Sequence, residues 1–136
     1  MEEMEARVWQ RVGGKQPMEL PRLAQLCGQA AGDYRALAAA FSGEARQTLL
    51  ALHRESAFAA RALGGILTLR GLDPLPVPAP WREQNKRRAL ALAYRRSNML
   101  WNEFFTRSSS GEFAPVFRYL AQQESAISAR ITALIT

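Results

Sequence analysis

The chain has 136 residues, the size of one domain with a sizeable core. Its 18 Lys and Arg residues outnumber 12 Asp and Glu residues, which gives a formal net charge of +6. A single cysteine excludes an intramolecular disulfide, and no apolar run approaches the roughly 20 residues needed to cross a bilayer. Ala, Leu, Arg, Glu and Gln dominate while β-branched residues are few, so the composition favours an all-α protein.

Residues 1–19 are set apart from the long helical patterns that follow. The start, Met1 to Glu5, is acidic where a signal peptide would be basic and then apolar, so we expect a cytoplasmic protein. The apolar pair Val8 and Trp9 is followed by two glycines and Pro17. We therefore predict an arm or short helix that docks through Trp9.

The first helix is expected to begin near Pro21, because proline is well tolerated in the first turn of a helix. Ser42 and Gly43 end it, and the Ser42 side chain is expected to cap the second helix. The second helix runs from about Glu44 to about Leu69, and Gly71 stops it. A spacing of three and four residues defines its inner face, which is apolar except for Ser56 and one carboxylate, Glu55. The residues of this face are Leu49, Leu52, Glu55, Ser56, Ala59, Leu63 and Ile66.

Residues 71–80 cannot form a helix, because proline alternates with other residues. The segment is expected to be extended, close to polyproline II. About ten such residues span about 30 Å, roughly the length of a 20-residue helix. This segment is therefore a crossover that returns the chain to the other end of a bundle.

The second half repeats the helical plan. A third helix is expected from Trp81 to Arg107, and a fourth from near Glu112 with Pro115 in its first turn. The expected stripe of the third helix is Leu90, Ala93, Tyr94, Ser97, Trp101 and Phe104; that of the fourth is Val116, Leu120, Glu124, Ile127, Ile131 and Leu134. Residues 20–136 thus form a four-helix bundle of two antiparallel hairpins, 20–70 and 81–136.

One short sequence motif occurs in both hairpins, at Glu55 to Arg61 and at Glu124 to Arg130, and each copy follows a Ser-Gly-Glu turn. In both copies the Glu falls in the stripe that its helix should bury. A buried carboxylate without a partner is costly, so each must be paired or stay protonated.

Three arrangements are open for Glu55 and Glu124. They could face each other and share a proton, titrating as a coupled pair. Together with Cys27 they could form a weak mononuclear metal site. Otherwise partners could reach them across the bundle, because Arg61 and Arg130 are poorly placed on their own helices: Arg35, Arg96, Tyr34, Tyr94 or Ser97.

Two helical hairpins, a crossover, and an inward Glu in the second helix of each hairpin resemble the ferritin-like superfamily, and in detail its rubrerythrin-like branch, over about Leu20 to Ile135. The resemblance implies two irons bound by one Glu from the first and third helices and a Glu-x-x-His from the second and fourth. It also implies a partner, because relatives of rubrerythrin often pair.

This chain departs from that ligand set. The second-helix motif falls on Glu55 and Phe58, and the fourth-helix motif on Glu124 and Ile127, so both Glu are present and both His are absent. In the resembled family, the Glu ligand of the first helix lies seven residues before an aromatic residue. In this chain that position is occupied by Cys27, seven residues before Tyr34. The same spacing in the third helix gives Ser97, seven residues before Phe104.

The missing ligands argue against a di-iron centre and against ferroxidase or peroxidase chemistry. Phe58 and Ile127 are expected to fill the places of the imidazoles, and no Cys-x-x-Cys motif of a rubredoxin domain is present. We therefore expect no cofactor, and a non-enzymatic ferritin-like protein with a structural or interaction role. Its partner would be an unknown protein or a second copy, bound through the aromatics Trp81, Trp101 or Phe113.

Two other functions stay open. Glu55, Glu124 and Cys27 could bind iron or another divalent metal weakly, or take part in redox chemistry. The basic stretch Arg82 to Arg96 could meet nucleic-acid phosphates, although its charges spread around the helix and are more typical of a solvated face. His53, the single histidine, is expected on the flank of its helix.

Overall fold

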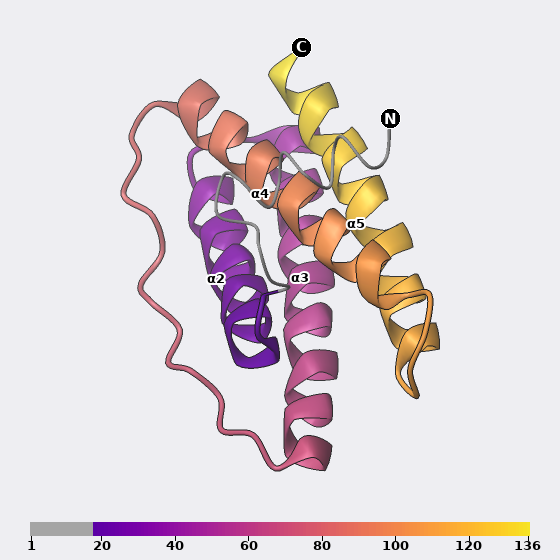
Figure 1. Cartoon of the computed structure of the whole chain (residues 1–136). Coiled ribbons are helices and arrows are strands. Elements are labelled where there is room, and N and C mark those ends of the chain that lie inside the picture. The colour runs from indigo at the N-terminus through magenta and orange to yellow at the C-terminus, as the bar shows by residue number, and fades with distance from the viewer. Residues whose placement is uncertain (1–17) are drawn as a thin grey trace, which may run out of the picture.

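The computed structural model describes residues 18–136, and this part of the chain contains four α-helices and no strand (Figure 1). The helices are α2 (Leu20–Ala38), α3 (Gly43–Arg70), α4 (Lys86–Arg107) and α5 (Ala114–Ile135). The all-α expectation is confirmed. The arm predicted to dock through Trp9 lies outside the described residues.

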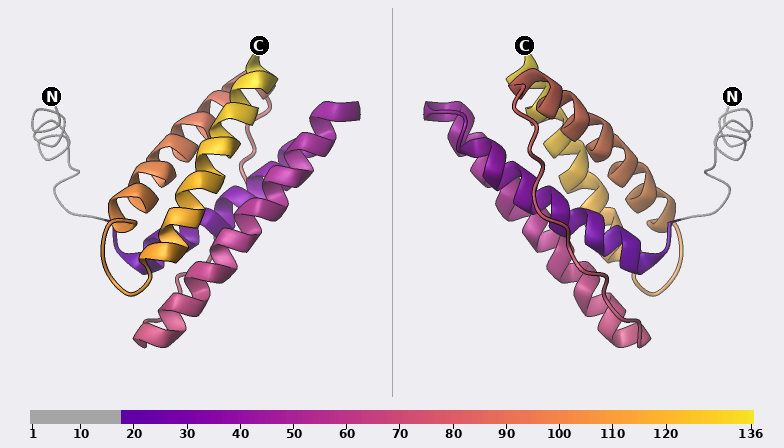
Figure 2. Two further views of the ribbon diagram at one scale, coloured as in Figure 1. Left: turned by 90° about the vertical axis from the view of Figure 1, so that its right-hand side faces the viewer. Right: turned by 90° about the vertical axis from the view of Figure 1, so that its left-hand side faces the viewer.

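The helices form two antiparallel hairpins, α2 with α3 and α4 with α5, which contact each other mainly through α3 with α5 and α2 with α4. Figure 2 shows the two hairpins inclined to one another. Because the connection between them returns along the molecule, α3 and α4 both run from the top of Figure 1 towards the bottom. Each helix contributes one face to the interior.

The helix ends follow the local sequence signals in most places. Proline occupies the first turn of both α2 and α5, and α3 ends at Gly71, whose φ of 67° is the left-handed conformation that glycine tolerates best. Ser42 is the N-cap residue of α3 by position, but its side chain makes no capping hydrogen bond. The expected cap at Ser42 is therefore wrong.

Helix α4 begins at Lys86, later than the expected start at Trp81. The side chain of Asn85 accepts a hydrogen bond from the Arg88 N–H and caps the helix there, while the Trp81 N–H donates to Asp33 Oδ1 at 2.8 Å. This bond ties Trp81 to α2, and residues 72–85 before the helix contain no regular secondary structure.

The connecting segment, residues 71–85, lies along one face of α2 and runs in the same direction. Gln25 Nε2 donates to the Pro76 carbonyl oxygen at 2.6 Å, and a Cβ added to Gly28 would lie 3.0 Å from Val77 Cγ2. One turn further, a Cβ on Gly32 would lie 3.5 Å from Pro80. The absence of a side chain at Gly28 is what allows this close approach.

The apolar core consists of two clusters that together involve all four helices. In α4 the buried face differs from the expected stripe: Tyr94 and Trp101 are exposed, whereas Arg96 and Leu100 are buried. The hydrophobicity of Tyr94 and Trp101 had placed them inside. The difference arises because Arg96 pairs with Asp33 of α2 and draws its own face of α4 inward.

The three aromatics expected to bind a partner fall into two groups. Trp81 and Phe113 are half-buried and pack against the core clusters, so they are not available as free surface aromatics. Trp101 is 36% exposed. None of the helices among residues 18–136 has the length and apolar character needed to span a membrane.

Candidate functional site

A buried ion pair joins the two hairpins. Arg96 Nη1 lies 2.5 Å from Asp33 Oδ2, and the side chains are 8% and 1% exposed. The second carboxylate oxygen of Asp33 accepts the Trp81 N–H, and the Arg96 guanidinium lies 4.2 Å from the centre of the Trp81 ring. One charged pair therefore connects α2, α4 and the end of the connecting segment.

The pairing with Asp33 does not use all the hydrogen-bond donors of Arg96. Its Nε and Nη2 atoms are buried and have no hydrogen-bond partner among the described residues. The guanidinium lies 5.5 Å from the centre of the buried Tyr34 ring. An arginine is always charged in a protein, so the bundle interior contains a permanent positive charge with spare donor capacity.

The repeated Glu of α5, Glu124, is buried at 4% exposure, as its place in the stripe predicted. The Ser97 hydroxyl lies 2.8 Å from Glu124 Oε2, Ser128 Oγ lies 2.7 Å from Ser97 Oγ, and Ser128 Oγ lies 3.1 Å from Asn98 Oδ1. Because Asn98 is exposed, this chain of hydroxyl groups links the buried carboxyl to the surface.

Burial raises the pKa of Glu124 to about 7, while the hydrogen bond with Ser97 and the charge of Arg96 act in the opposite direction. The nearby charge of Glu55 raises this pKa further. Burial also raises the pKa of the Cys27 thiol and of the Tyr34 hydroxyl well above their usual ranges, so both stay protonated. Cys27 is consequently not a thiolate nucleophile.

The other repeated Glu, Glu55, has a different environment. Its side chain is 28% exposed, and Arg130 Nη2 of α5 lies 2.6 Å from its Oε1. Arg130 is poorly placed for Glu124 on its own helix, but it reaches across to Glu55 of α3. No hydrogen bond joins Glu55 to Glu124 in the described part of the chain, so the shared-proton arrangement is not formed.

The two residues at the histidine positions also differ. Ile127 is 1% exposed and fills the interior as expected. Phe58 is 42% exposed, and its ring packs edge-on against Tyr119 with centroids 5.6 Å apart. The expectation that Phe58 fills the place of an imidazole is therefore wrong, because its side chain turns out of the bundle towards α5.

The weak metal site left open for Cys27, Glu55 and Glu124 is not assembled as a ligand cluster in the described residues. Within residues 18–136 no group of three or more His, Cys, Asp and Glu side chains is arranged to hold a metal ion. Glu55 is engaged by Arg130, and Glu124 by Ser97. The interior instead brings together Cys27, Tyr34, Arg96, Ser97 and Glu124, from α2, α4 and α5.

Asp33 was missed in the sequence, although a signal was present. It is the one acidic residue between Leu20 and Phe41, in a helix that otherwise carries apolar, small and basic or amide side chains. An isolated acid on the inner side of such a helix requires a buried partner. Arg96 was recognised as a possible partner for the two Glu, but not for Asp33.

The basic stretch from Arg82 to Arg96 does not form one charged face. Arg96 is buried, Arg88 pairs with Glu83 at 3.6 Å, and the Lys86 ammonium lies 5.1 Å from the centre of the Phe41 ring. His53 is half-buried on the flank of α3, as expected, and its Nδ1–H donates to the Ala31 carbonyl oxygen at 2.8 Å.

No family model, curated protein or solved structure matches this chain.

Proposed function

We propose that this protein is a non-enzymatic ferritin-like bundle in which an ion pair and a hydroxyl network occupy the place of the di-iron centre. Its role is then to bind another protein chain rather than to transform a substrate. Arg96 is the observation that carries this proposal. A guanidinium in the bundle interior, paired with Asp33 and close enough to lower the pKa of Glu124, opposes the entry of a divalent cation.

The arrangement of the helices supports the ferritin-like part of the proposal. Two antiparallel hairpins are joined by a long extended segment, and this segment makes α3 and α4 run in the same direction (Figure 1). Short connections would instead give simple up-and-down order. The positions that correspond to the ligands of rubrerythrin-like proteins lie on all four helices, but they hold Cys27 and Ser97 in place of two carboxylates.

The exposed stripe of α4 is the surface that we propose for the partner. Tyr94, Trp101 and Phe105 are exposed on one side of this helix, and the rings of Trp101 and Phe105 stack with centroids 5.0 Å apart. The residues between them on that side, Asn98 and Asn102, are exposed and uncharged. We refer to these five residues as the aromatic stripe.

A second copy of this chain is the occupant that the charge distribution favours. In a twofold contact the same patch of both copies meets, and side chains near the axis face their own counterparts, so a face that carries one sign of charge would repel its copy. The chain carries a net charge of +6, yet the aromatic stripe contains no charged residue. Aromatic residues are also enriched in protein interfaces.

The absence of di-iron chemistry is tested by an assay of ferrous iron oxidation and of peroxide reduction with the purified full-length protein. We expect neither rate to exceed that of buffer, and thermal unfolding to be unchanged by a chelator. Iron-dependent turnover that is lost in Glu124→Gln would overturn the proposal. The Glu44→Gln variant is the matched control, because Glu44 is an exposed carboxylate in the first turn of α3 and belongs to none of the ligand positions.

The partner surface is tested by analytical ultracentrifugation over a range of protein concentrations. We expect a monomer–dimer equilibrium that shifts towards monomer when Trp101 and Phe105 are both replaced by Ser. The control replaces Phe58 and Tyr119, the other exposed aromatic pair, by Ser and should leave the equilibrium unchanged. A wild-type protein that is monomeric throughout would contradict self-association through this stripe.

A further inference from the structure

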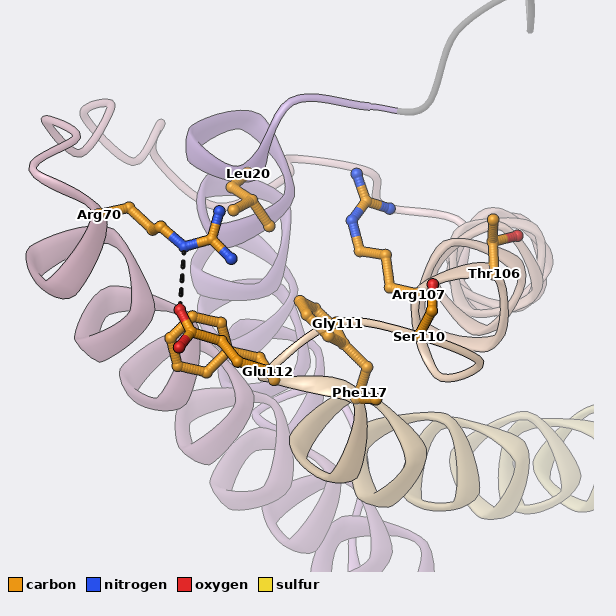
Figure 3. Close-up of a pocket in the computed structure, with 10 residues that line it drawn as sticks. Leu20, Arg70, Thr106, Arg107, Ser110, Gly111, Glu112 and Phe117 are labelled. Atoms are coloured by element: carbon orange, nitrogen blue, oxygen red, sulfur yellow. Dashed lines mark ion pairs between the residues drawn. The ribbon is translucent and has the colours of Figure 1, made fainter.

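We propose that the end of the bundle binds a small molecule that combines a carboxylate with an apolar body. The site is a pocket bounded by the start of α2, the end of α3 and the connection between α4 and α5 (Figure 3). Its volume is 290 Å³, near the lower limit of about 300 Å³ that is typical of small-molecule sites. The proposal is independent of the interior ion pair and of the aromatic stripe.

One side of the pocket presents a fixed arginine. Arg107 Nη1 donates to Glu103 Oε2 at 2.5 Å, and its Nη2 donates to the Met18 carbonyl oxygen. The side chain is only 15% exposed. Because these bonds hold the guanidinium in place, little conformational entropy is lost when it contacts a ligand.

The opposite side presents an arginine that is held loosely. Arg70 Nε lies 3.5 Å from Glu112 Oε1, and the two side chains are 48% and 69% exposed. Figure 3 shows this pair at the edge of the pocket, with Leu20 between Arg70 and Arg107. An exposed ion pair of this kind contributes little stability, so a ligand carboxylate can replace Glu112 as the partner of Arg70.

The remaining walls of the pocket indicate that the part of the ligand beyond its carboxylate is apolar. Leu20, Phe113, Ala114 and Phe117 give the pocket an apolar lining, and the Arg70 guanidinium lies 5.2 Å from the centre of the Phe113 ring. Ser110 and Thr106 add hydroxyl groups on the side of Arg107. An inorganic anion would leave the apolar walls uncovered, whereas a carboxylate on an apolar body meets both kinds of wall. Glu112 already shows the carboxylate contact that the ligand would take over.

Octanoate binding to the full-length protein, measured by isothermal titration calorimetry, tests this proposal. The Arg70→Gln variant should weaken binding about three- to tenfold, because one charge-assisted hydrogen bond is lost at a partly exposed site. The Glu112→Gln variant should strengthen it about two- to fivefold, because the competing carboxylate is removed. Both residues are exposed enough for the substitutions to leave the fold intact.

The control variant is Arg61→Gln, which removes an exposed arginine from the same helix but outside the pocket, and it should bind as the wild type does. Octanol and inorganic phosphate, each carrying one half of the proposed chemistry, should bind more weakly than octanoate. The proposal is overturned if octanoate does not bind, if phosphate binds as tightly, or if Arg61→Gln weakens binding as much as Arg70→Gln does.

Discussion

Arg96 Nη1 lies 2.5 Å from Asp33 Oδ2, and this ion pair is enclosed where the two hairpins meet. Each member depends on the other, because an unpaired charge at this depth would have almost no contact with water. The Trp81 ring covers the Arg96 guanidinium, and the Trp81 N–H donates a hydrogen bond to the second carboxylate oxygen of Asp33. The pair thus specifies how the connecting segment, α2 and α4 fit together.

Replacing Arg96 with Met should lower the free energy of unfolding by about 3–5 kcal/mol, because Asp33 is left buried without its cation. Urea denaturation monitored by circular dichroism measures the change. The double variant Asp33→Asn with Arg96→Met should recover part of this loss, since no buried charge is left. The control Arg95→Met removes an exposed neighbouring arginine and should change stability by less than about 0.5 kcal/mol. Equal effects of Arg96→Met and Arg95→Met would contradict the role of the ion pair.

Glu124 should make stability fall as the pH rises. Its pKa is about 7 in the folded protein and 4.5 as the ordinary value, so between these values the folded state holds a proton that the unfolded state has released. Below about pH 4.5 Glu124 is protonated in both the folded and the unfolded state, so it does not change the free energy of unfolding. Above about pH 7 the free energy of unfolding is lowered by the full amount. Glu124→Gln cannot ionise and retains an acceptor for Ser97.

The expected result is that Glu124→Gln and wild type have similar stability near pH 4, whereas the variant is more stable at pH 8 by on the order of 3 kcal/mol. Urea denaturation at a series of pH values provides the measurement. Glu55→Gln, the matching position of the repeat, should change stability by less than about 1 kcal/mol, because the ion pair with Arg130 is partly exposed. A wild-type stability that does not fall relative to Glu124→Gln between pH 4 and pH 8 would show that the carboxyl is ionised at little cost.

The contact of Gly28 with Val77 predicts that a large side chain at this position displaces the connecting segment. Gly28→Leu should lower the free energy of unfolding by about 1–3 kcal/mol through overpacking. It should also speed proteolysis within residues 71–85. Gly64→Leu is the control, because nothing lies within 4 Å of a Cβ at Gly64, and it should be neutral or stabilising. Unchanged proteolysis in Gly28→Leu would mean that the contact of Val77 with Gly28 does not hold the segment on α2.

The main outline of the fold could be predicted because it depends on local signals. Three-four spacing of apolar residues predicted the helices, Gly71 predicted the end of α3, and alternating prolines predicted an extended connection. The start of α4 was placed too early because the Trp81 N–H donates a hydrogen bond to Asp33, which is far away in the sequence, and this bond holds Trp81 in the connecting segment. Local propensity contains no information on such a bond.

The site was harder to predict for the same reason. Hydrophobicity assigned Trp101 to the interior and gave no reason to bury Arg96, yet a charged side chain can be buried when a buried partner compensates it. The repeat suggested equal environments for Glu55 and Glu124, but one meets Arg130 and the other meets Ser97. Which partner each carboxylate meets depends on how one hairpin is placed against the other.

The metal content of protein purified without an affinity tag, measured by elemental mass spectrometry before and after incubation with ferrous iron, tests the central claim most directly. The account predicts less than about a tenth of a metal ion per chain, because two carboxylates and a buried guanidinium do not form the ligand set that iron needs. Near-stoichiometric iron that disappears in Glu124→Gln would contradict it. That result would mean that the bundle interior is a metal site and that Arg96 moves to admit the ion.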